Sequence, residues 1–262
     1  MRITILATGS RGDVEPYVAL GKGLVGAGHA VRLVTHEDFE HLVDSNGIEF
    51  WRVEGRVQEI AEGMAGLLEQ GNFRAIMAEM GKQAQQGALR MADAGLAACQ
   101  DADRILGGIA GIYTGTAIAE KLGIPLIQAY YIPYTPTRAY PSFILPKTPI
   151  NFGPLNRLSY LLSRQVMWQP LRAADKLVRE QKLGLRPAPM SGPFNSPALR
   201  GQPILYGFSP AVIPPAPDWG ENVHVTGYWF LDRAGEWTSP PALRDFLEAG
   251  PPLILAEVSA TR

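Results

Sequence analysis

Asp13 is the acidic residue of this sequence whose position best suits proton transfer. It follows an apolar run at Ile3, Ile5 and Leu6 and a glycine-containing turn. The residues from Val14 onward repeat at helical spacing, which predicts that Asp13 lies where a strand ends and a helix begins, the rim at which open α/β sheets bind ligands. A carboxylate there can take a proton from a reacting hydroxyl as a general base. The position also suits a helix N-cap, a frequent role of aspartate.

The turn before Asp13 has glycines at positions 9 and 12, and this G-x-x-G spacing differs from the dinucleotide-binding fingerprint. Two roles are open for Ser10, Arg11 and Gly12. They form a simple turn between strand and helix, or their backbone N–H groups face a phosphate of a nucleotide donor. These three are the candidate donor-binding residues.

A second group of candidate residues lies in an aromatic stretch at residues 130–154. Five prolines before Pro154 disfavour regular structure, yet the stretch is too apolar for an ordinary solvated loop. Its aromatic residues form either plain core or the wall of a pocket, and we interpret them as lining a pocket for an apolar acceptor. Arg138 in the same loop is expected to anchor an ion pair. The candidate acceptor-binding residues are Tyr130, Tyr131, Tyr134, Thr135, Tyr140 and Phe143.

The composition narrows the classes of function. The 262 residues include 24 basic and 25 acidic ones, which gives no electrostatic argument for nucleic acid or an anionic membrane surface as a partner. The single cysteine, Cys99, excludes an internal disulfide and is expected to be a buried hydrophobe. His29 and His36 are interpreted as structural, and the spacing of the four histidines gives no support for a metal site. The longest uncharged run, 105–119, is too short and glycine-rich to span a membrane, so we expect a cytoplasmic protein.

Strands and helices alternate along the chain. This alternation predicts an α/β fold with a Rossmann-like, doubly wound parallel sheet and right-handed crossovers. Strands are predicted at residues 3–6, 30–35, 48–53, 104–106, 124–129 and 203–208, with a short extended segment at 223–230 and a last strand at 252–258. Helices are predicted from Val14 to about 26, at 37–46, at 73–99, at 110–122, at 156–182 with a break near Pro170, and after Pro240 and Pro241; a further segment lies around 57–68.

Several motifs spread over nearly the whole chain carry a resemblance to a known family. They are GSRGDVEPYVALG at 9–21, AGH at 27–29, AEKLGIP at 119–125, PYTPTR at 133–138, YGFSP at 206–210, VTGYWF at 225–230 and FLEAGPP at 246–252. Together they resemble the N-terminal half of bacterial glycosyltransferases. The most similar of these are related to sterol glucosyltransferases and to enzymes that glycosylate glycopeptide antibiotics.

The resemblance implies the GT-B arrangement, in which two Rossmann-like domains face each other and hold the acceptor and the nucleotide-sugar, respectively. Similar enzymes place an aspartate or histidine at the turn of Asp13 as the general base of an inverting displacement. One base suffices, because a nucleoside diphosphate leaves without an acid. The implied reaction transfers a hexose to a hydroxyl of a sterol, lipid or polyketide-like acceptor, with the nucleotide-sugar as co-substrate and no bound cofactor.

The sequence departs from the family pattern after residue 252, where relatives continue into a whole second domain. We therefore expect an acceptor-binding domain at 1–208, a proline-rich linker with a short helix at 209–252, and at 253–262 a remnant of the first strand of a missing donor-binding domain. Such a chain is expected to be inactive alone. The alternative is a non-catalytic small-molecule-binding module, or one half of a split enzyme with a separate donor domain. An uncovered domain face and an unpaired strand also predict a homo-oligomer.

Overall fold

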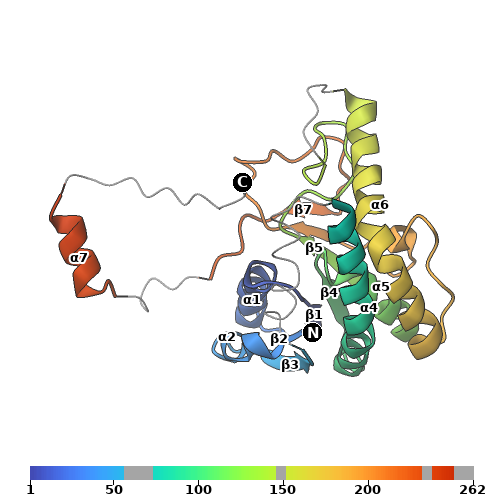
Figure 1. Ribbon diagram of the computed structural model, residues 1–262, viewed down its shortest axis with the longest axis horizontal. Helices are drawn as coiled ribbons and strands as arrows, with labels where there is room; N and C mark the ends of the chain where they lie inside the picture. Colours follow the sequence, from blue (N-terminus) through green and yellow to red (C-terminus); the bar gives the residue numbers. More distant parts are fainter. Residues whose placement is uncertain (56–72, 146–151, 232–237, 251–262) are drawn as a thin grey trace.

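The computed structural model describes residues 1–55, 73–145, 152–231 and 238–250 (Figure 1). The segment at 57–68 and the predicted strand at 252–258 lie outside the described residues. The strands are β1 (Arg2–Leu6), β2 (Ala30–His36), β3 (Glu49–Val53), β4 (Arg104–Gly107), β5 (Leu126–Tyr130), β6 (Ile204–Tyr206) and β7 (Val223–Val225). The helices are α1 (Arg11–Gly26), α2 (Glu40–Asp44), α4 (Phe73–Ala98), α5 (Ile112–Leu122), α6 (Gly153–Leu177) and α7 (Pro241–Glu248), with short 3₁₀ segments η1 (Glu37–Phe39) and η3 (Pro193–Asn195) and a π-helical extension of α6, η2 (Val178–Leu183).

In the described part of the chain, seven strands form one parallel sheet in the order β3-β2-β1-β4-β5-β6-β7. The strands run outward in one direction from β1 to β3 and in the other from β4 to β7. This is the doubly wound, Rossmann-like sheet that the sequence predicts. The crossovers diverge between β1 and β4, which leaves a crevice at the carboxyl ends of these strands. Asp13 follows β1 and therefore lies at this switch point.

Helices cover both faces of the sheet, α1 and α2 on one side and α4, α5 and α6 on the other (Figure 1). In β1, Ile3 and Ile5 pack with Val14 of α1, whereas Leu6 packs on the opposite face. Successive side chains of a strand point to opposite faces, so a strand covered on both sides is mostly apolar. The polar exception in β1 is the buried Thr4, whose hydroxyl donates a hydrogen bond of 3.1 Å to the carbonyl of Ala98. Cys99 is buried in the second of these layers, as predicted, and burial raises the pKa of its thiol to about 12.

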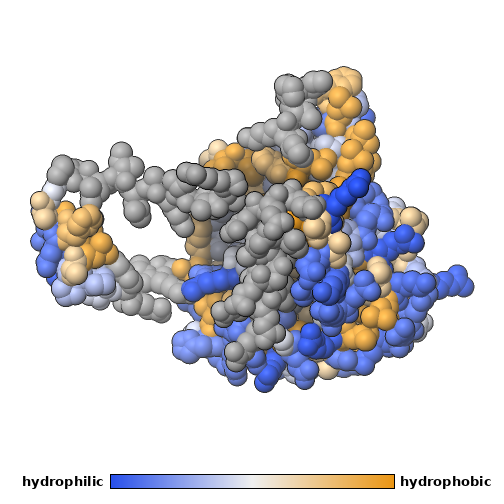
Figure 2. All heavy atoms as spheres, viewed as in Figure 1, coloured by the Kyte–Doolittle hydropathy of each residue, from blue (hydrophilic) through white to orange (hydrophobic). Residues whose placement is uncertain are grey.

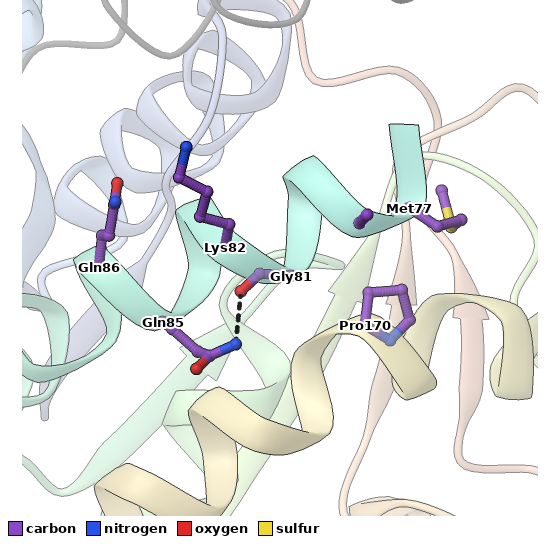
Figure 3. A pocket seen from close by; sticks show the side chains of 7 residues that line it. Met77, Gly81, Lys82, Gln85, Gln86 and Pro170 are labelled. Atoms are coloured by element: carbon purple, nitrogen blue, oxygen red, sulfur yellow. Dashed lines mark hydrogen bonds between the residues drawn. The ribbon is translucent and has the colours of Figure 1, made fainter. Parts of the chain in front are cut away.

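The helix α6 runs without interruption through Pro170, whereas the sequence predicted a break there. Helix α4 packs closely against it. At Gly81 of α4, a Cβ would lie only 3.0 Å from the carbonyl oxygen of Pro170. Figure 3 shows the shallow hollow at this contact, where Gln85 donates a hydrogen bond of 3.3 Å to the carbonyl of Gly81. Proline removes one main-chain hydrogen bond from the helix, and α6 continues past it where α4 packs against it. Neither α6 nor any other helix among the described residues is long and apolar enough to cross a membrane.

The sheet extends beyond residue 208. Strand β7, within the segment predicted as a linker, pairs in parallel with β6. Ile204 lies opposite Val223, and Tyr206 lies opposite Val225. Downstream of β7, Trp229 covers Gly207, where a Cβ would lie 2.6 Å from the indole ring. The predicted helix after Pro241 is confirmed as α7, all of whose residues are exposed and which lies apart from the sheet in Figure 1. The division near residue 252 stays a prediction.

Candidate active site

The turn between β1 and α1 fixes the carboxylate of Asp13. Helix α1 begins at Arg11 with Ser10 as its N-cap, so Asp13 lies inside the first turn and is not itself the N-cap. Its Oδ2 accepts hydrogen bonds from the backbone N–H and from the hydroxyl of Ser10, each 2.8 Å long. Gly9 has a φ of 125°, and a Cβ there would lie 2.5 Å from Asp13 Oδ2. The glycine is therefore required for the carboxylate to close the turn.

Gly9→Ala is expected to lower the free energy of unfolding by about 1–3 kcal/mol, because alanine must adopt a positive φ and its methyl group displaces the carboxylate. Gly12→Ala is the matched control. Gly12 lies in α1, where a Cβ meets only Ser10 Oγ at 3.8 Å, so alanine is expected to stabilise the helix by up to about 1 kcal/mol. Urea denaturation measures both changes. Equal stability of Gly9→Ala and the unchanged chain contradicts the turn geometry.

The second oxygen of Asp13 is held by Tyr131, which follows β5. The Tyr131 hydroxyl donates a hydrogen bond of 2.5 Å to Asp13 Oδ1. Burial, together with this bond to a carboxylate, raises the pKa of Tyr131, so its hydroxyl keeps its proton at neutral pH. Tyr17 of α1 packs edge-on against the Tyr131 ring and anchors its own hydroxyl on the carbonyl of Ala129 at 2.7 Å. Both oxygens of the half-buried Asp13 are thus oriented by donors from two separate elements.

A cavity of about 690 Å³ opens beside Asp13 and Tyr131. This volume is within the usual range for small-molecule sites. The cavity lies over the carboxyl ends of β1, β2 and β3, and its walls come from α4, α5 and α6. Most of the wall is apolar, including Met80, Ala84, Met91, Tyr113, Met167 and Leu171. The arrangement therefore places a carboxylate at the wall of a cavity suited to a large apolar molecule.

His36, at the end of β2, adds a polar group to the cavity wall. Its Nδ1 lies 3.0 Å from the carbonyl oxygen of Gly55, which can only accept, so Nδ1 carries the proton. Burial lowers the pKa of His36 despite this hydrogen bond. The imidazole is consequently neutral at pH 7, and Nε2 is its accepting nitrogen. The sequence reasoning treated His36 as structural and did not place it in a site.

Of the six residues predicted to bind an acceptor, Tyr131 lines the cavity, whereas Tyr130 and Tyr134 lie in the core. Both are fully buried, with ring centroids 5.3 Å apart. Tyr206 of β6 joins this cluster, and its hydroxyl donates to Thr135 Oγ1 at 2.7 Å. A ligand in the cavity therefore contacts neither Tyr130 nor Tyr134.

Tyr140 and Phe143 lie farther along the loop and do not line the cavity. Their ring centroids are 6.0 Å apart, and Tyr140 also packs edge-on against Trp219. Phe143 is half exposed on the outer surface. Of the six predicted acceptor-binding residues, Tyr131 therefore lines the cavity and the other five do not.

The predicted donor-binding residues Ser10, Arg11 and Gly12 are exposed at the first turn of α1. Arg11 forms an ion pair of 2.6 Å with Glu15, one helical turn later. The three residues lie next to Asp13 in sequence but outside the cavity wall. Their backbone N–H groups lie at a helix N-terminus, which favours anions.

Helix α4 forms much of the cavity wall, and the sequence reasoning missed this role. Its Ala84, Gly87, Ala88 and Met91 recur at helical spacing and all line the cavity. Small side chains on the inner face of a helix leave space that larger residues would fill. A stripe of small residues at that spacing was the signal present in the sequence.

A doubly wound sheet with an oriented carboxylate at its switch point, beside an apolar cavity, defines an α/β domain built to hold a small molecule. The chain belongs to the family of glycosyltransferase family 28 N-terminal domains. The sequence pattern of that family matches residues 3–141, more than half of the 262 residues.

Among curated proteins, the chain is similar to sterol 3-beta-glucosyltransferases. It is 38% identical over 256 residues to that of Cryptococcus neoformans var. neoformans serotype D (strain JEC21), an alignment covering 95% of this chain and 16% of the relative. It is 38% identical over 253 residues to that of Neurospora crassa, covering 94% of this chain and 16% of the relative. The chain thus spans about a sixth of the length of these curated relatives.

Solved structures share the fold. The glycosyltransferase of kitacinnamycin superimposes with a TM-score of 0.56 and 19% identity over 92% of this chain and 55% of its own. The glycosyltransferase VinC, solved with dTDP, superimposes with a TM-score of 0.56 and 16% identity over 93% of this chain and 57% of its own. The fold is therefore the Rossmann-like α/β fold of GT-B glycosyltransferases.

Proposed function

We propose that this chain is the acceptor-binding part of an inverting glycosyltransferase that transfers a hexose from a nucleotide-sugar to a hydroxyl of an apolar acceptor. A sterol is the proposed acceptor, because sterol glucosyltransferases are 38% identical to the chain. The nucleotide-sugar is assigned to a second domain as a co-substrate. In this proposal the N–H groups of Arg11 and Gly12 face its phosphates beside Ser10, whose own N–H is bonded to Asp13 Oδ2.

The observation that carries the proposal is the position of Asp13. Its carboxylate lines the apolar cavity while Ser10 holds Oδ2 and Tyr131 holds Oδ1. A carboxylate oxygen has two lone pairs, so Oδ1 can accept a second hydrogen bond from an acceptor hydroxyl. The cavity holds the apolar body of the acceptor, and its size limits how that body turns. The hydroxyl is thereby presented to a base of fixed orientation.

The proposed reaction is a single displacement at the anomeric carbon of the sugar. Asp13 takes the hydroxyl proton as the acceptor oxygen forms a bond to the anomeric carbon of the sugar. The bond from that carbon to the diphosphate oxygen breaks on the opposite face, and its electron pair leaves with the nucleoside diphosphate. The configuration at the anomeric carbon inverts. Asp13 afterwards releases the proton to water, and Tyr131 returns the carboxylate to its starting orientation.

Ala84→Phe is expected to weaken sterol binding about tenfold or more, equivalent to about 1.4 kcal/mol, because the ring fills part of the cavity. Ala78→Phe is the matched control, since Ala78 lies on the same helix but lines the shallow hollow beside Pro170. Ergosterol delivered from cyclodextrin should raise the melting temperature of the unchanged chain and of Ala78→Phe, because the ligand binds the folded state.

Equal ergosterol-induced shifts in Ala84→Phe and Ala78→Phe would place the acceptor outside this cavity. The alternative of a non-catalytic binding module gives a different result. In that case ergosterol binds as expected, but no glucosyl sterol forms from UDP-glucose when the chain is joined to a sugar-nucleotide-binding domain of a relative. Formation of the glucosyl sterol with inverted configuration supports the proposed transferase.

A further inference from the structure

Trp229 packs on the residues that hold the Asp13 carboxylate, although it lies far from them in the sequence. Its indole contacts the ring of Tyr17, with ring centroids 5.9 Å apart and an angle of 53° between the planes. Tyr17 packs edge-on against Tyr131 at 6.4 Å, and Tyr131 donates the hydrogen bond to Asp13 Oδ1. Contiguous contacts therefore lead from Trp229 through two tyrosines to the carboxylate.

Tyr17 has little freedom to move at this position. It is 2% exposed, and its hydroxyl donates to the carbonyl of Ala129 in β5. A Cβ at Gly108, which follows β4, would lie only 1.8 Å from that hydroxyl, so the tyrosine occupies the space over the glycine. Trp229 closes a further side of the ring. A smaller side chain at position 229 leaves space into which the ring can tilt, and closely packed interiors transmit such shifts to their neighbours.

The segment 226–231, which we call the strap, fixes Trp229 in place. Thr226 donates twice to the carbonyl of Tyr206 at the end of β6, through its N–H at 2.9 Å and its hydroxyl at 3.1 Å. Trp229 Nε1 donates to Thr226 Oγ1 at 2.9 Å. Gly227 has a φ of 83°, a conformation that favours glycine and turns the chain between the two residues. The indole is therefore held by hydrogen bonds as well as by packing.

The strap uses one face only. Trp229 and Leu231 pack against the apolar layer that contains α1, whereas Tyr228 and Phe230 are 46% and 77% exposed. This alternation is that of an extended segment. Farther along the chain, α7 stands apart from the sheet in Figure 1, and Figure 2 shows the same separation. Among the described residues, the strap is thus the last segment packed on the sheet.

We propose that Trp229 is a positioning residue for the carboxylate of Asp13. It holds the ring of Tyr17 against Tyr131 and thereby keeps the Tyr131 hydroxyl on Asp13 Oδ1. Its effect on turnover rests on the proposed function, in which Asp13 is the base, whereas the positioning is a property of this chain alone. Trp229 does not line the cavity, so it acts on the orientation of the base and not on acceptor binding. A misplacement of about 1 Å at a reacting group costs about 10²-fold in rate.

The first test uses urea denaturation of this chain alone. Tyr131→Phe removes only the hydroxyl and so measures the hydrogen bond to Asp13. Its cost in stability is expected to be smaller in a Trp229→Leu background than in the unchanged chain, because the bond is already weakened when the indole is absent. Residues coupled through contacts deviate from additivity in this way. Additive effects of Tyr131→Phe and Trp229→Leu overturn the proposal.

Trp219→Leu is the matched control. Trp219 is also a partly buried tryptophan, and its Nε1 donates to the carbonyl of Thr135 at 3.3 Å. Its ring contacts are with Tyr206 at 5.0 Å and with Tyr140 at 6.2 Å rather than with Tyr17. Tyr131→Phe is expected to cost as much in the Trp219→Leu background as in the unchanged chain. A cost reduced equally in both backgrounds reflects a general loosening of the fold and contradicts the specific role of Trp229.

The second test measures glucosyl transfer by the chain joined to a sugar-nucleotide-binding domain. Trp229→Leu is expected to lower kcat about 10- to 10²-fold with KM for ergosterol nearly unchanged. Trp229→Phe keeps an aromatic ring on Tyr17 and should restore most of kcat, and Trp219→Leu should retain it.

The same assay separates this inference from the proposed function. If Trp229→Leu and Trp219→Leu have equal kcat in an enzyme that Asp13→Asn inactivates, Trp229 has no positioning role and the proposed function stands. If the unchanged joined protein forms no glucosyl sterol, the proposed function fails. In that case the double substitution of Trp229 and Tyr131 still decides whether Trp229 holds Tyr131 on Asp13.

Discussion

Asp13→Asn is expected to lower kcat for glucosyl transfer about 10²–10⁴-fold, the usual contribution of a general base. The measurement uses a polypeptide that joins this chain to a sugar-nucleotide-binding domain. Asparagine keeps the shape of the side chain and an oxygen that can accept the N–H of Ser10, the bond that closes the first turn of α1. It cannot take a proton, so acceptor affinity should stay nearly unchanged while turnover falls.

Two controls separate a role of Asp13 as the general base from its structural role in the first turn of α1. Ser10→Ala removes the hydroxyl that bonds to Asp13 Oδ2 and leaves the carboxylate, so it should retain most of kcat. Mass spectrometry of the Asp13→Asn protein excludes deamidation back to aspartate. Near-normal turnover in a verified Asp13→Asn protein would show that Asp13 serves only the helix and that the base is another group. His36, neutral in the cavity wall, is then the next residue to replace.

Arg179→Met is expected to destabilise the fold by about 3–5 kcal/mol at pH 7, because it leaves the buried carboxylate of Asp175 and the partly buried one of Glu120 without their cation. Arg179 has a side chain that is 3% exposed and bonds to Glu120 at 2.6 Å and to Asp175 at 3.0 Å. Ser196 donates a further hydrogen bond of 2.6 Å to Glu120. Although burial opposes it, the bonds from Arg179 and Ser196 lower the pKa of Glu120, whereas burial raises the pKa of Asp175.

The loss in Arg179→Met should shrink as the pH falls from 7 toward 5. Without the guanidinium, burial raises the pKa of both carboxyl groups in the folded variant above their unfolded values. The folded variant then binds more protons than the unfolded chain, so its stability rises relative to the unchanged protein as the pH falls. Urea denaturation at both pH values measures the difference.

Lys176→Met is the control for this pair of measurements. Lys176 lies 3.9 Å from Glu180 with its side chain 61% exposed, so its loss should change stability by no more than about 0.5 kcal/mol at either pH. An Arg179→Met protein as stable as the Lys176→Met protein at pH 7 contradicts the role of Arg179 as the cation of a buried network.

The sequence by itself determined the order of strands and helices and the position of Asp13. These features depend on short stretches, because apolar periodicity and a glycine turn act on neighbouring residues. Ile3 and Ile5, the glycine at position 9 and the helical repeat from Val14 were enough to predict β1, the turn and α1. The position of Asp13 at the rim of the sheet followed from that order. The motifs at 9–21 and 119–125 were sufficient to suggest the family that the comparisons show.

Only the tertiary structure decided which side chains face the cavity. Tyr130, at the end of β5, and Tyr131 and Tyr134, just after it, have similar composition around them. Pairing of β6 with β5 nevertheless buries Tyr130 and Tyr134 beside Tyr206 and leaves Tyr131 on Asp13. The cavity exists because small residues of α4 face α6 and the strand ends. Burial is set by which distant element packs opposite a residue, and local sequence patterns carry no information about that partner.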